Sequence, residues 1–322
     1  MAGRRASGMS RTGGGESAVV LERVTKRYGG HIAVDEVSLA IARGSVHGFI
    51  GPNGAGKTST LRMIMHITLP DAGRVTVLGR PAGRETSQQV GYLPEERGLY
   101  PKMRVGALIE YLGQLKGRTR AELKPRIDAW LDRMGLLAWK QKRCQELSKG
   151  MQQKVQFIAT VVHDPELILL DEPFSGLDPL NAEVLIGIVE EWKRAGKTVI
   201  FSTHVMEHAE KLCDAVFMIV RGRKVLDGTL ESIRARHREE IVDVEGDGPR
   251  ERLAQAPGVI RCAGDGGRYE LLLRPGADPQ ELLRHVAGGF RVHRFEVRTP
   301  RLHDLFVQLA GDAAQPTSAG GE

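Results

Sequence analysis

Cysteine is scarce in this sequence, and long apolar runs are missing. The 322 residues include three cysteines, Cys144, Cys213 and Cys262, which lie far apart with no CxxC spacing. They predict neither a disulfide framework nor a zinc site, and they favour a reducing, cytoplasmic compartment. No uninterrupted apolar segment approaches the roughly 20 residues of a membrane helix. The arginines among the first sixteen residues are not followed by the apolar stretch of a secretory signal. We therefore expect any membrane role to be exercised through a partner.

Aromatic residues are also few, at 5%, but the overall composition is that of a globular protein. Hydrophobic residues make up 41% and charged residues 27%, which argues against wholesale disorder. The net charge of +6 is moderately basic and has two interpretations. It can mark a surface that faces nucleic acid or anionic lipid, or it can reflect arginines spread over a solvated surface. Composition alone favours the second interpretation.

The residue pattern changes once along the chain. From Val19 to about Leu226, short β-rich runs alternate with helical stretches, which predicts an α/β domain with a mostly helical insert. After about residue 230, alternating strand and helix patterns predict a small ferredoxin-like α+β domain. The predicted organisation is a disordered tail at 1–16, the α/β domain at 17–230, the α+β domain at 231–310 and a disordered tail at 311–322.

A glycine-rich segment, GPNGAGKTS, fits the phosphate-binding pattern G-x-x-x-x-G-K-[ST] completely. Its glycines let the backbone curl so that successive N–H groups point at phosphate oxygens, and the positive end of the following helix faces the same anion. We expect Lys57 to contact the β- and γ-phosphates and the Thr58 hydroxyl to ligate Mg²⁺. The predicted nucleotide-binding loop consists of Gly51, Pro52, Asn53, Gly54, Ala55, Gly56, Lys57, Thr58 and Ser59.

A second segment, LILLDEP, reads as an apolar strand that ends in two acids. A buried strand would deliver Asp171 to the Mg²⁺ shell and leave Glu172 at the mouth of the site. The Glu172 carboxylate can orient and deprotonate an attacking water, as a general base must. Taken alone, the pattern is equally consistent with an acidic helix cap that follows a strand.

Three more motifs surround this strand: LSKGM before it, then SGLDP and FSTH, the last ending at His204. In this order and at this spacing, the five motifs resemble those of the ATP-binding cassette (ABC) family. GPNGAGKTS resembles the Walker A loop, LILLDEP the Walker B strand, LSKGM the signature motif, SGLDP the D-loop and His204 the switch histidine. Tyr28, upstream of the Walker A loop, matches the aromatic residue that the family stacks on adenine.

Two motifs depart from the family pattern. The Q-loop usually carries Gln, but GYLPEERGLYPKM places Glu95 there, and a carboxylate can ligate Mg²⁺ but cannot donate a hydrogen bond as Gln can. The signature motif has Lys149 and Met151 where the commonest form has Gly and Gln, while Ser148 and Gly150 remain. We interpret the chain as a subfamily variant. YLPEERGLY and the extra C-terminal domain resemble exporter ATPases of the sodium-extrusion and drug-efflux type.

The resemblance implies a fold and a mechanism. The fold is a P-loop NTPase cassette with a mixed-sheet core and a helical subdomain, followed by the small α+β domain. Two cassettes, expected to form a homodimer, would bind ATP and Mg²⁺ between the P-loop of one chain and Ser148, Gly150 and Asp178 of the other. ATP-driven closure of this dimer would power export through a permease on a separate chain. We expect the protein on the inner face of the cell membrane, without bound nucleic acid.

The resemblance also assigns roles to single residues. Glu172 is the expected general base, His204 senses or holds the γ-phosphate, and Glu95 completes the catalytic set. The expected Mg²⁺ ligands are Thr58, Asp171 and Glu95. In the segment after Glu95, we hypothesise that Tyr100 and Pro101 contact a cytoplasmic helix of the permease.

Two other functions stay open on the sequence alone. The first is a soluble ABC ATPase that acts on nucleic acid, the ribosome or iron–sulfur assembly, which the basic net charge supports. Ribosome-acting members resemble two cassettes in one chain, and DNA-repair members carry long coiled coils; this sequence shows neither. The second is a binding module without catalysis, against which the intact Lys57, Asp171 and Glu172 argue.

Overall fold

The computed structural model describes residues 16–96, 98–236 and 240–306. The chain divides into two compact units, Met1–Asp227 and Gly228–Glu322, and the division falls three residues before the predicted boundary at 230. Of the two tails that the sequence predicts to be disordered, only Glu16 belongs to the described residues.

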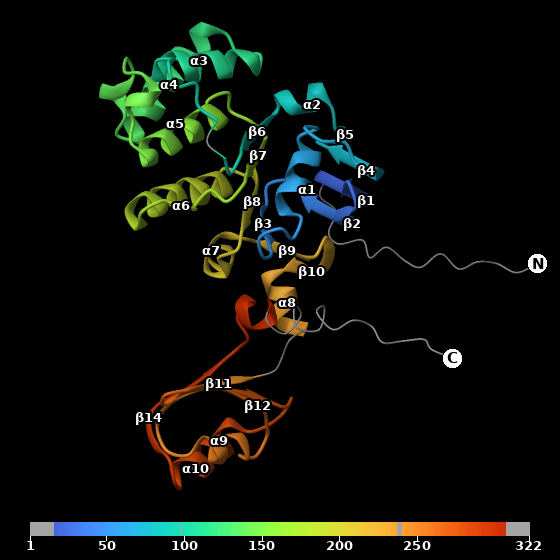
Figure 1. The fold of residues 1–322 in the computed structure, drawn as a ribbon, viewed down its shortest axis with the longest axis vertical. Coiled ribbons are helices and arrows are strands. Elements are labelled where there is room, and N and C mark those ends of the chain that lie inside the picture. Colours follow the sequence, from blue (N-terminus) through green and yellow to red (C-terminus); the bar gives the residue numbers. More distant parts are fainter. Residues whose placement is uncertain (1–15, 97, 237–239, 307–322) are drawn as a thin grey trace, which may run out of the picture. The chain divides into compact units, whose positions relative to one another are not determined.

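The first unit is built on a six-stranded sheet with the order β10-β9-β3-β8-β7-β6 (Figure 1). Its strands are β3 (Val46–Ile50), β6 (Val90–Leu93), β7 (Leu167–Leu170), β8 (Thr198–Thr203), β9 (Ala215–Val220) and β10 (Arg223–Thr229). From β9 through β3, β8 and β7 to β6 the strands run parallel, so their carboxyl ends meet at one edge. Every residue of β3, β7, β8 and β9 is buried, because a parallel sheet is covered on both faces.

A second sheet, antiparallel and four-stranded, has the order β2-β1-β4-β5. Its strands are β1 (Ser17–Tyr28), β2 (His31–Ala42), β4 (Ala72–Val77) and β5 (Arg80–Pro81). Side chains along β2 alternate, with Val37, Leu39 and Ile41 buried and the residues between them exposed, so one face of the sheet belongs to the core. Strands β1 and β2 lie in the region of predicted β-rich runs from Val19 onward, whereas the sequence analysis singles out neither β4 nor β5.

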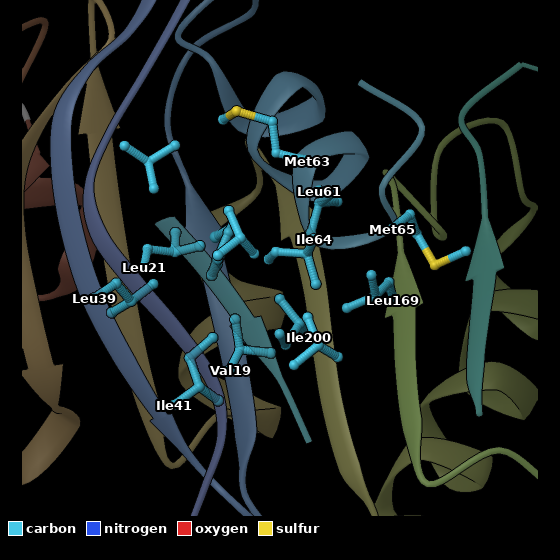
Figure 2. Close-up of a cluster of buried hydrophobic side chains, with 14 of the residues drawn as sticks. Val19, Leu21, Leu39, Ile41, Leu61, Met63, Ile64, Met65, Leu169 and Ile200 are labelled. Atoms are coloured by element: carbon cyan, nitrogen blue, oxygen red, sulfur yellow. The ribbon is translucent and has the colours of Figure 1, made fainter. Parts of the chain in front are cut away.

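Helix α1 (Lys57–Ile64) joins the two sheets into one core (Figure 2). Its buried Leu61 and Ile64 point into a cluster to which both sheets contribute. The neighbours labelled in Figure 2 include Val19, Leu21, Leu39 and Ile41 of the antiparallel sheet and Leu169 and Ile200 of the parallel sheet. Burying each such side chain stabilises the fold by roughly 1.5–3 kcal/mol. The loop that precedes α1 is therefore held on a well-packed core.

The predicted helical insert is a subdomain on the β6 side of the parallel sheet, away from β1 and β2 (Figure 1). Its elements are α3 (Val105–Leu115), α4 (Arg120–Arg133), the 3₁₀ turns η1 (Leu137–Trp139) and η2 (Cys144–Glu146), and α5 (Lys149–Val161). A capping box begins α4, since Thr119 Oγ1 accepts the Glu122 N–H and Glu122 Oε2 accepts the Thr119 N–H at 2.8 Å. The remaining helices of this unit are α2 (Arg84–Gln88), α6 (Pro179–Arg194) and α7 (Met206–Leu212). Among the described helices, none combines the length and apolarity needed to cross a membrane.

The second unit has its own antiparallel sheet with the order β12-β13-β11-β14. Its elements are α8 (Leu230–Arg236), β11 (Ile241–Asp247), α9 (Arg250–Ala254), β12 (Val259–Asp265), β13 (Arg268–Leu273), α10 (Pro279–Ala287) and β14 (Arg291–Arg298). From β11 to β14 this is the βαββαβ order of the ferredoxin-like fold, as the sequence predicts. Residues Val242, Leu271 and Leu282 belong to a separate apolar core. The segment RLHDLFVQLA at 301–310, which the sequence pattern predicts to be helical, lies partly outside the described residues.

Candidate nucleotide-binding site

The glycine-rich loop runs from the end of β3 to the start of α1, and two of its glycines have no room for a side chain. A Cβ on Gly51 would lie 2.2 Å from the carbonyl oxygen of Ile219, and one on Gly56 would lie 2.3 Å from that of Ala33. Gly56 is also the N-cap of α1, with a φ of 111° that L side chains rarely adopt. The loop is thus pressed against its neighbours, and its backbone N–H groups are held at the N-terminus of α1.

Lys57, the first residue of α1, is only 6% exposed and bonds to several loop atoms. Its Nζ donates to the carbonyl oxygens of Gly51 at 2.8 Å and Pro52 at 3.2 Å. The same ammonium lies 3.3 Å from Glu172 Oε1, in an ion pair between two buried side chains. The loop cation and the acid that follows β7 therefore share one site.

Asp171 and Thr58 meet at the same edge. The Thr58 hydroxyl donates to Asp171 Oδ1 at 3.1 Å, and Asp171 is only 1% exposed. Ser202, near the end of β8, donates to the same Asp171 oxygen at 2.6 Å and accepts the Glu172 N–H at 2.8 Å. Two predicted metal ligands are thus in contact, and a serine that the sequence did not single out positions both acids.

Tyr92 of β6 is a further neighbour of the Asp171 carboxylate. Its hydroxyl lies 3.5 Å from Asp171 Oδ2. Burial, together with the neighbouring Asp171 carboxylate, raises the pKa of Tyr92 to about 12. The phenol therefore stays protonated at neutral pH and serves as a hydrogen-bond donor to Asp171.

Glu172 is held by a second contact, with His204. His204 Nδ1 lies 3.0 Å from Glu172 Oε2, and the histidine is half exposed whereas Glu172 is 8% exposed. The backbone of Glu172 adopts a φ of 48°, in the left-handed region. This turn directs the carboxylate back toward the loop and His204, so the predicted base and the predicted switch histidine form one pair.

An open pocket of about 450 Å³ lies against the loop, within the size range of ligand sites. Tyr28 forms part of its wall with 44% of its surface exposed, which leaves an aromatic face accessible for stacking. The described residues that line the pocket are Tyr28, His31, Ala33, Asn53, Gly54, Ala55, Gly56, Lys57, Thr58, Ser59, Glu95 and Glu172. His31 was not predicted; it reaches the pocket because the β1–β2 hairpin returns the chain beside Tyr28.

Glu95, the Q-loop position, lines this pocket and also a neighbouring one of about 190 Å³ that contains Asp171, Gln153 and Gln156. Among the described residues, no cluster of three or more His, Cys, Asp or Glu side chains has the arrangement of a metal cage. Proteins usually hold Mg²⁺ through one or two side chains together with phosphate oxygens and waters. Thr58 and Asp171 supply such oxygens, with Glu95 at the wall of the same pocket.

The 450 Å³ pocket is not lined by Ser148, Gly150 or Asp178, whereas Ser175 and Gly176 of the D-loop motif line the neighbouring pocket. Ser148 is the N-cap of α5, where its Oγ accepts the Met151 N–H, and Gly150 lies in the first turn. Asp178 is the N-cap of α6 and accepts the Asn181 N–H at 3.0 Å. All three lie at helix N-termini, those of α5 and α6.

Two family models match the chain. The model described as ABC transporter matches residues 34–175, and the model described as ATP-binding protein DrrA1-3-like, C-terminal domain, matches residues 228–310. The first match contains both the P-loop and the acids after β7, and the second coincides with the ferredoxin-like unit.

Individual proteins and structures are similar over most of one or both units. The uncharacterised ABC transporter ATP-binding protein YhaQ of Bacillus subtilis is 38% identical over 293 residues, which cover 91% of this chain and 98% of YhaQ. The Nod factor export ATP-binding protein I of Rhizobium sp. is 33% identical over 305 residues, covering 91% and 97%. A solved ATP-binding subunit of an ABC transporter aligns with a TM-score of 0.65 and 30% identity, covering 68% of this chain and 93% of that one. The chain therefore belongs to the ATP-binding proteins of ABC transporters, a family that hydrolyses ATP to power transport.

Proposed function

We propose that this chain is the Mg²⁺-dependent ATPase subunit of an exporter, and that it works as a dimer of cassettes on a separately encoded permease. The observation that carries the proposal is the convergence of Lys57, Thr58, Asp171, Glu172 and His204 at one sheet edge. The similarity to a Nod factor export protein supports export. The protein would lie on the inner face of the membrane, held there by the permease.

The loop residues bind and orient the triphosphate. Backbone N–H groups at the start of α1 and the Lys57 ammonium face the phosphates, and Tyr28 stacks on the base. In the structure Lys57 is paired with Glu172. Because a phosphate oxygen competes with that carboxylate for the same cation, nucleotide binding frees Glu172 to act on water.

Mg²⁺ would be held by the Thr58 hydroxyl and Asp171, with Glu95 as a further oxygen donor, and it would neutralise charge on the phosphates. Tyr92 and Ser202 fix the Asp171 carboxylate by hydrogen bonds. Glu172 then takes the proton of the attacking water. His204, bonded to the other Glu172 oxygen, orients the carboxylate and faces the terminal phosphate.

The second half of each site would come from a partner cassette through Ser148, Gly150 and Asp178. A complementation assay tests this directly. Lys57→Ala removes the phosphate cation, and Ser148→Arg places a bulky side chain on the signature face. Each variant alone should lack ATPase activity. A mixed dimer, however, contains one wild-type P-loop opposite one wild-type signature motif, so co-expression should restore a substantial fraction of the activity. A mixture as inactive as its components would exclude composite sites.

Transport is tested with the permease. The chain should co-purify with a polytopic membrane protein encoded beside it, and vesicles that contain both should move substrate only with ATP and Mg²⁺. Crosslinks from cysteines at positions 100 and 101 should reach a cytoplasmic helix of that permease. Crosslinks that consistently miss the permease would remove Tyr100 and Pro101 from the docking surface.

A further inference from the structure

The positive charge of the chain is concentrated in one part of the helical subdomain. Residues 102–154 contain thirteen Lys and Arg but only five Asp and Glu, an excess of eight positive charges, whereas the whole chain carries +6. The rest of the sequence is therefore slightly acidic. The positive charges are therefore unevenly distributed along the chain.

Backbone hydrogen bonds bring the centre of this basic region together. The segment 101–105 pairs with 142–145 in a short ribbon: Val105 N donates to Lys142 O at 2.9 Å, Cys144 N to Met103 O at 2.9 Å and Gln145 N to Pro101 O at 3.0 Å. Arg104 and Arg143 form an isolated antiparallel bridge between the two segments. Lys102, Arg104, Lys142 and Arg143 are thus neighbours although some 40 residues separate them in sequence; we call these four residues the basic ribbon.

The side chains of the basic ribbon are exposed, and none has an ion pair with a described residue. Arg104 donates only to the neutral side chain of Gln141. Other cations of the subdomain are neutralised locally, as Arg120 is by Glu110 and Lys140 by Asp128. The ribbon is therefore a surface of uncompensated positive charge.

Exposed apolar side chains accompany the ribbon. Tyr100, which precedes it, is 52% exposed and packs edge-on against Tyr111 of α3, with ring centroids 6.4 Å apart. Tyr111 is 42% exposed. Amphipathic rings beside unpaired cations match the polar–apolar boundary of a lipid bilayer.

We propose that the basic ribbon binds the anionic headgroups of the membrane that holds the permease. The inference rests on the proposed function, because the permease would bring this face to the membrane. The phosphate groups of anionic lipids attract the four cations, beside the segment Tyr100–Pro101 that docks on the permease. Lipid fits better than nucleic acid, because the proposed permease-docking residues Tyr100 and Pro101 directly precede the ribbon and would hold it at the membrane.

Vesicle flotation of the full chain tests the proposal without any permease. The chain should float with vesicles of equal phosphatidylcholine and phosphatidylglycerol, stay behind with phosphatidylcholine alone, and dissociate at about 0.5 M salt, where screening is strong. The triple variant Lys102→Gln, Lys142→Gln, Arg143→Gln should lower partitioning by about 100-fold, from roughly fivefold per cation near an anionic surface. The control Arg27→Gln, Arg74→Gln, Arg84→Gln removes equal charge from exposed sites outside the helical subdomain and should retain wild-type binding.

Several results would overturn the proposal. Equal losses in both triple variants would mean that net charge alone drives binding, and absence of flotation with anionic vesicles would exclude a lipid surface. Retention of duplex DNA by the wild-type chain but not by the ribbon variant, without flotation, would assign the ribbon to nucleic acid. ATPase activity measured in detergent should be equal in all variants. A failure of the proposed ATPase function would appear in this assay, whereas a failure of lipid binding would appear only in flotation.

Discussion

The Ser202 hydroxyl donates a hydrogen bond to Asp171 Oδ1 across 2.6 Å, between two side chains that are both buried. The same hydroxyl accepts the backbone N–H of Glu172. One side chain of β8 thereby fixes both acids that follow β7, and it does so through the parallel pairing of the two strands. Ser202 acts through these acids and is a positioning residue.

Ser202→Ala should therefore impair both stability and metal use. The buried Glu172 N–H loses its acceptor, which costs roughly 1–3 kcal/mol of unfolding free energy. Without the hydrogen bond from Ser202, the Asp171 carboxylate is less well oriented. The Mg²⁺ concentration for half-maximal ATPase activity should therefore rise several-fold. Urea unfolding and Mg²⁺ titrations measure the two effects.

Thr203→Val is the matched control for this variant. Its hydroxyl accepts the Val205 N–H and contacts neither acid, so stability should fall while Mg²⁺ dependence stays normal. An identical Mg²⁺ response in the two variants would argue against the positioning role of Ser202.

Glu172→Gln should separate binding from catalysis. The amide keeps the shape of the side chain but cannot take a proton from water, so steady-state ATP hydrolysis should fall by about 10²–10⁴-fold. ATP binding, measured by equilibrium dialysis, should be retained. Glu183→Gln, which alters an exposed acid paired with Lys211, should leave hydrolysis unchanged. Normal turnover by Glu172→Gln would require a different base.

Glu95→Gln tests the unusual Q-loop. If the Glu95 carboxylate contributes to the Mg²⁺ site, replacing it with a neutral amide oxygen should weaken apparent Mg²⁺ affinity several-fold, with a larger effect in Glu95→Ala. The Glu96→Gln variant alters the neighbouring acid, which does not line the described pockets, and should behave as wild type. An unchanged Mg²⁺ titration in Glu95→Gln would restrict the metal site to Thr58 and Asp171.

His47 should make the first unit sensitive to acid. Burial in β3 lowers the pKa of His47 to about 4, and neither ring nitrogen has a hydrogen-bond partner among the described residues. Below about pH 6.5 the unfolded chain binds a proton that the folded chain excludes, so the free energy of unfolding falls as pH drops toward about 4. At about pH 5 the loss attributable to His47 is about 2 kcal/mol.

His47→Val should remove this part of the pH dependence. Urea unfolding at about pH 7.5 and about pH 5 measures it, and the fluorescence of the three tryptophans, Trp130, Trp139 and Trp192, reports on the first unit because all three lie there. His163, whose pKa burial also lowers to about 4, remains, so some sensitivity should persist. Equal pH dependence in variant and wild type would contradict the assignment to His47.

Much of the fold was predictable because its strands are buried on both faces. The apolar runs of β7, β8 and β9 stand out in the sequence, and the glycine pattern marks the loop between β3 and α1. Strand β4 was missed because its first three residues are exposed and its apolar alternation is short. Strand β5 spans two residues and owes its existence to pairing with β4.

Site residues were predictable where a local motif carries them, and not where the fold brings distant residues together. Ser202 looks like one polar residue in an apolar strand, and its role depends on how β7 and β8 align. The Lys57–Glu172 ion pair joins residues more than a hundred positions apart, and the sequence indicated only that each would meet the nucleotide.

The left-handed backbone conformation of Glu172 lowers the stability of the fold but supports its activity. A non-glycine residue there costs roughly 1–2 kcal/mol relative to ordinary helix or strand geometry, and the structure tolerates the cost because it aims the carboxylate at Lys57 and His204. Selection of this protein for heat resistance alone would favour glycine or asparagine at position 172. A variant stabilised in this way would keep the fold but lose ATP hydrolysis.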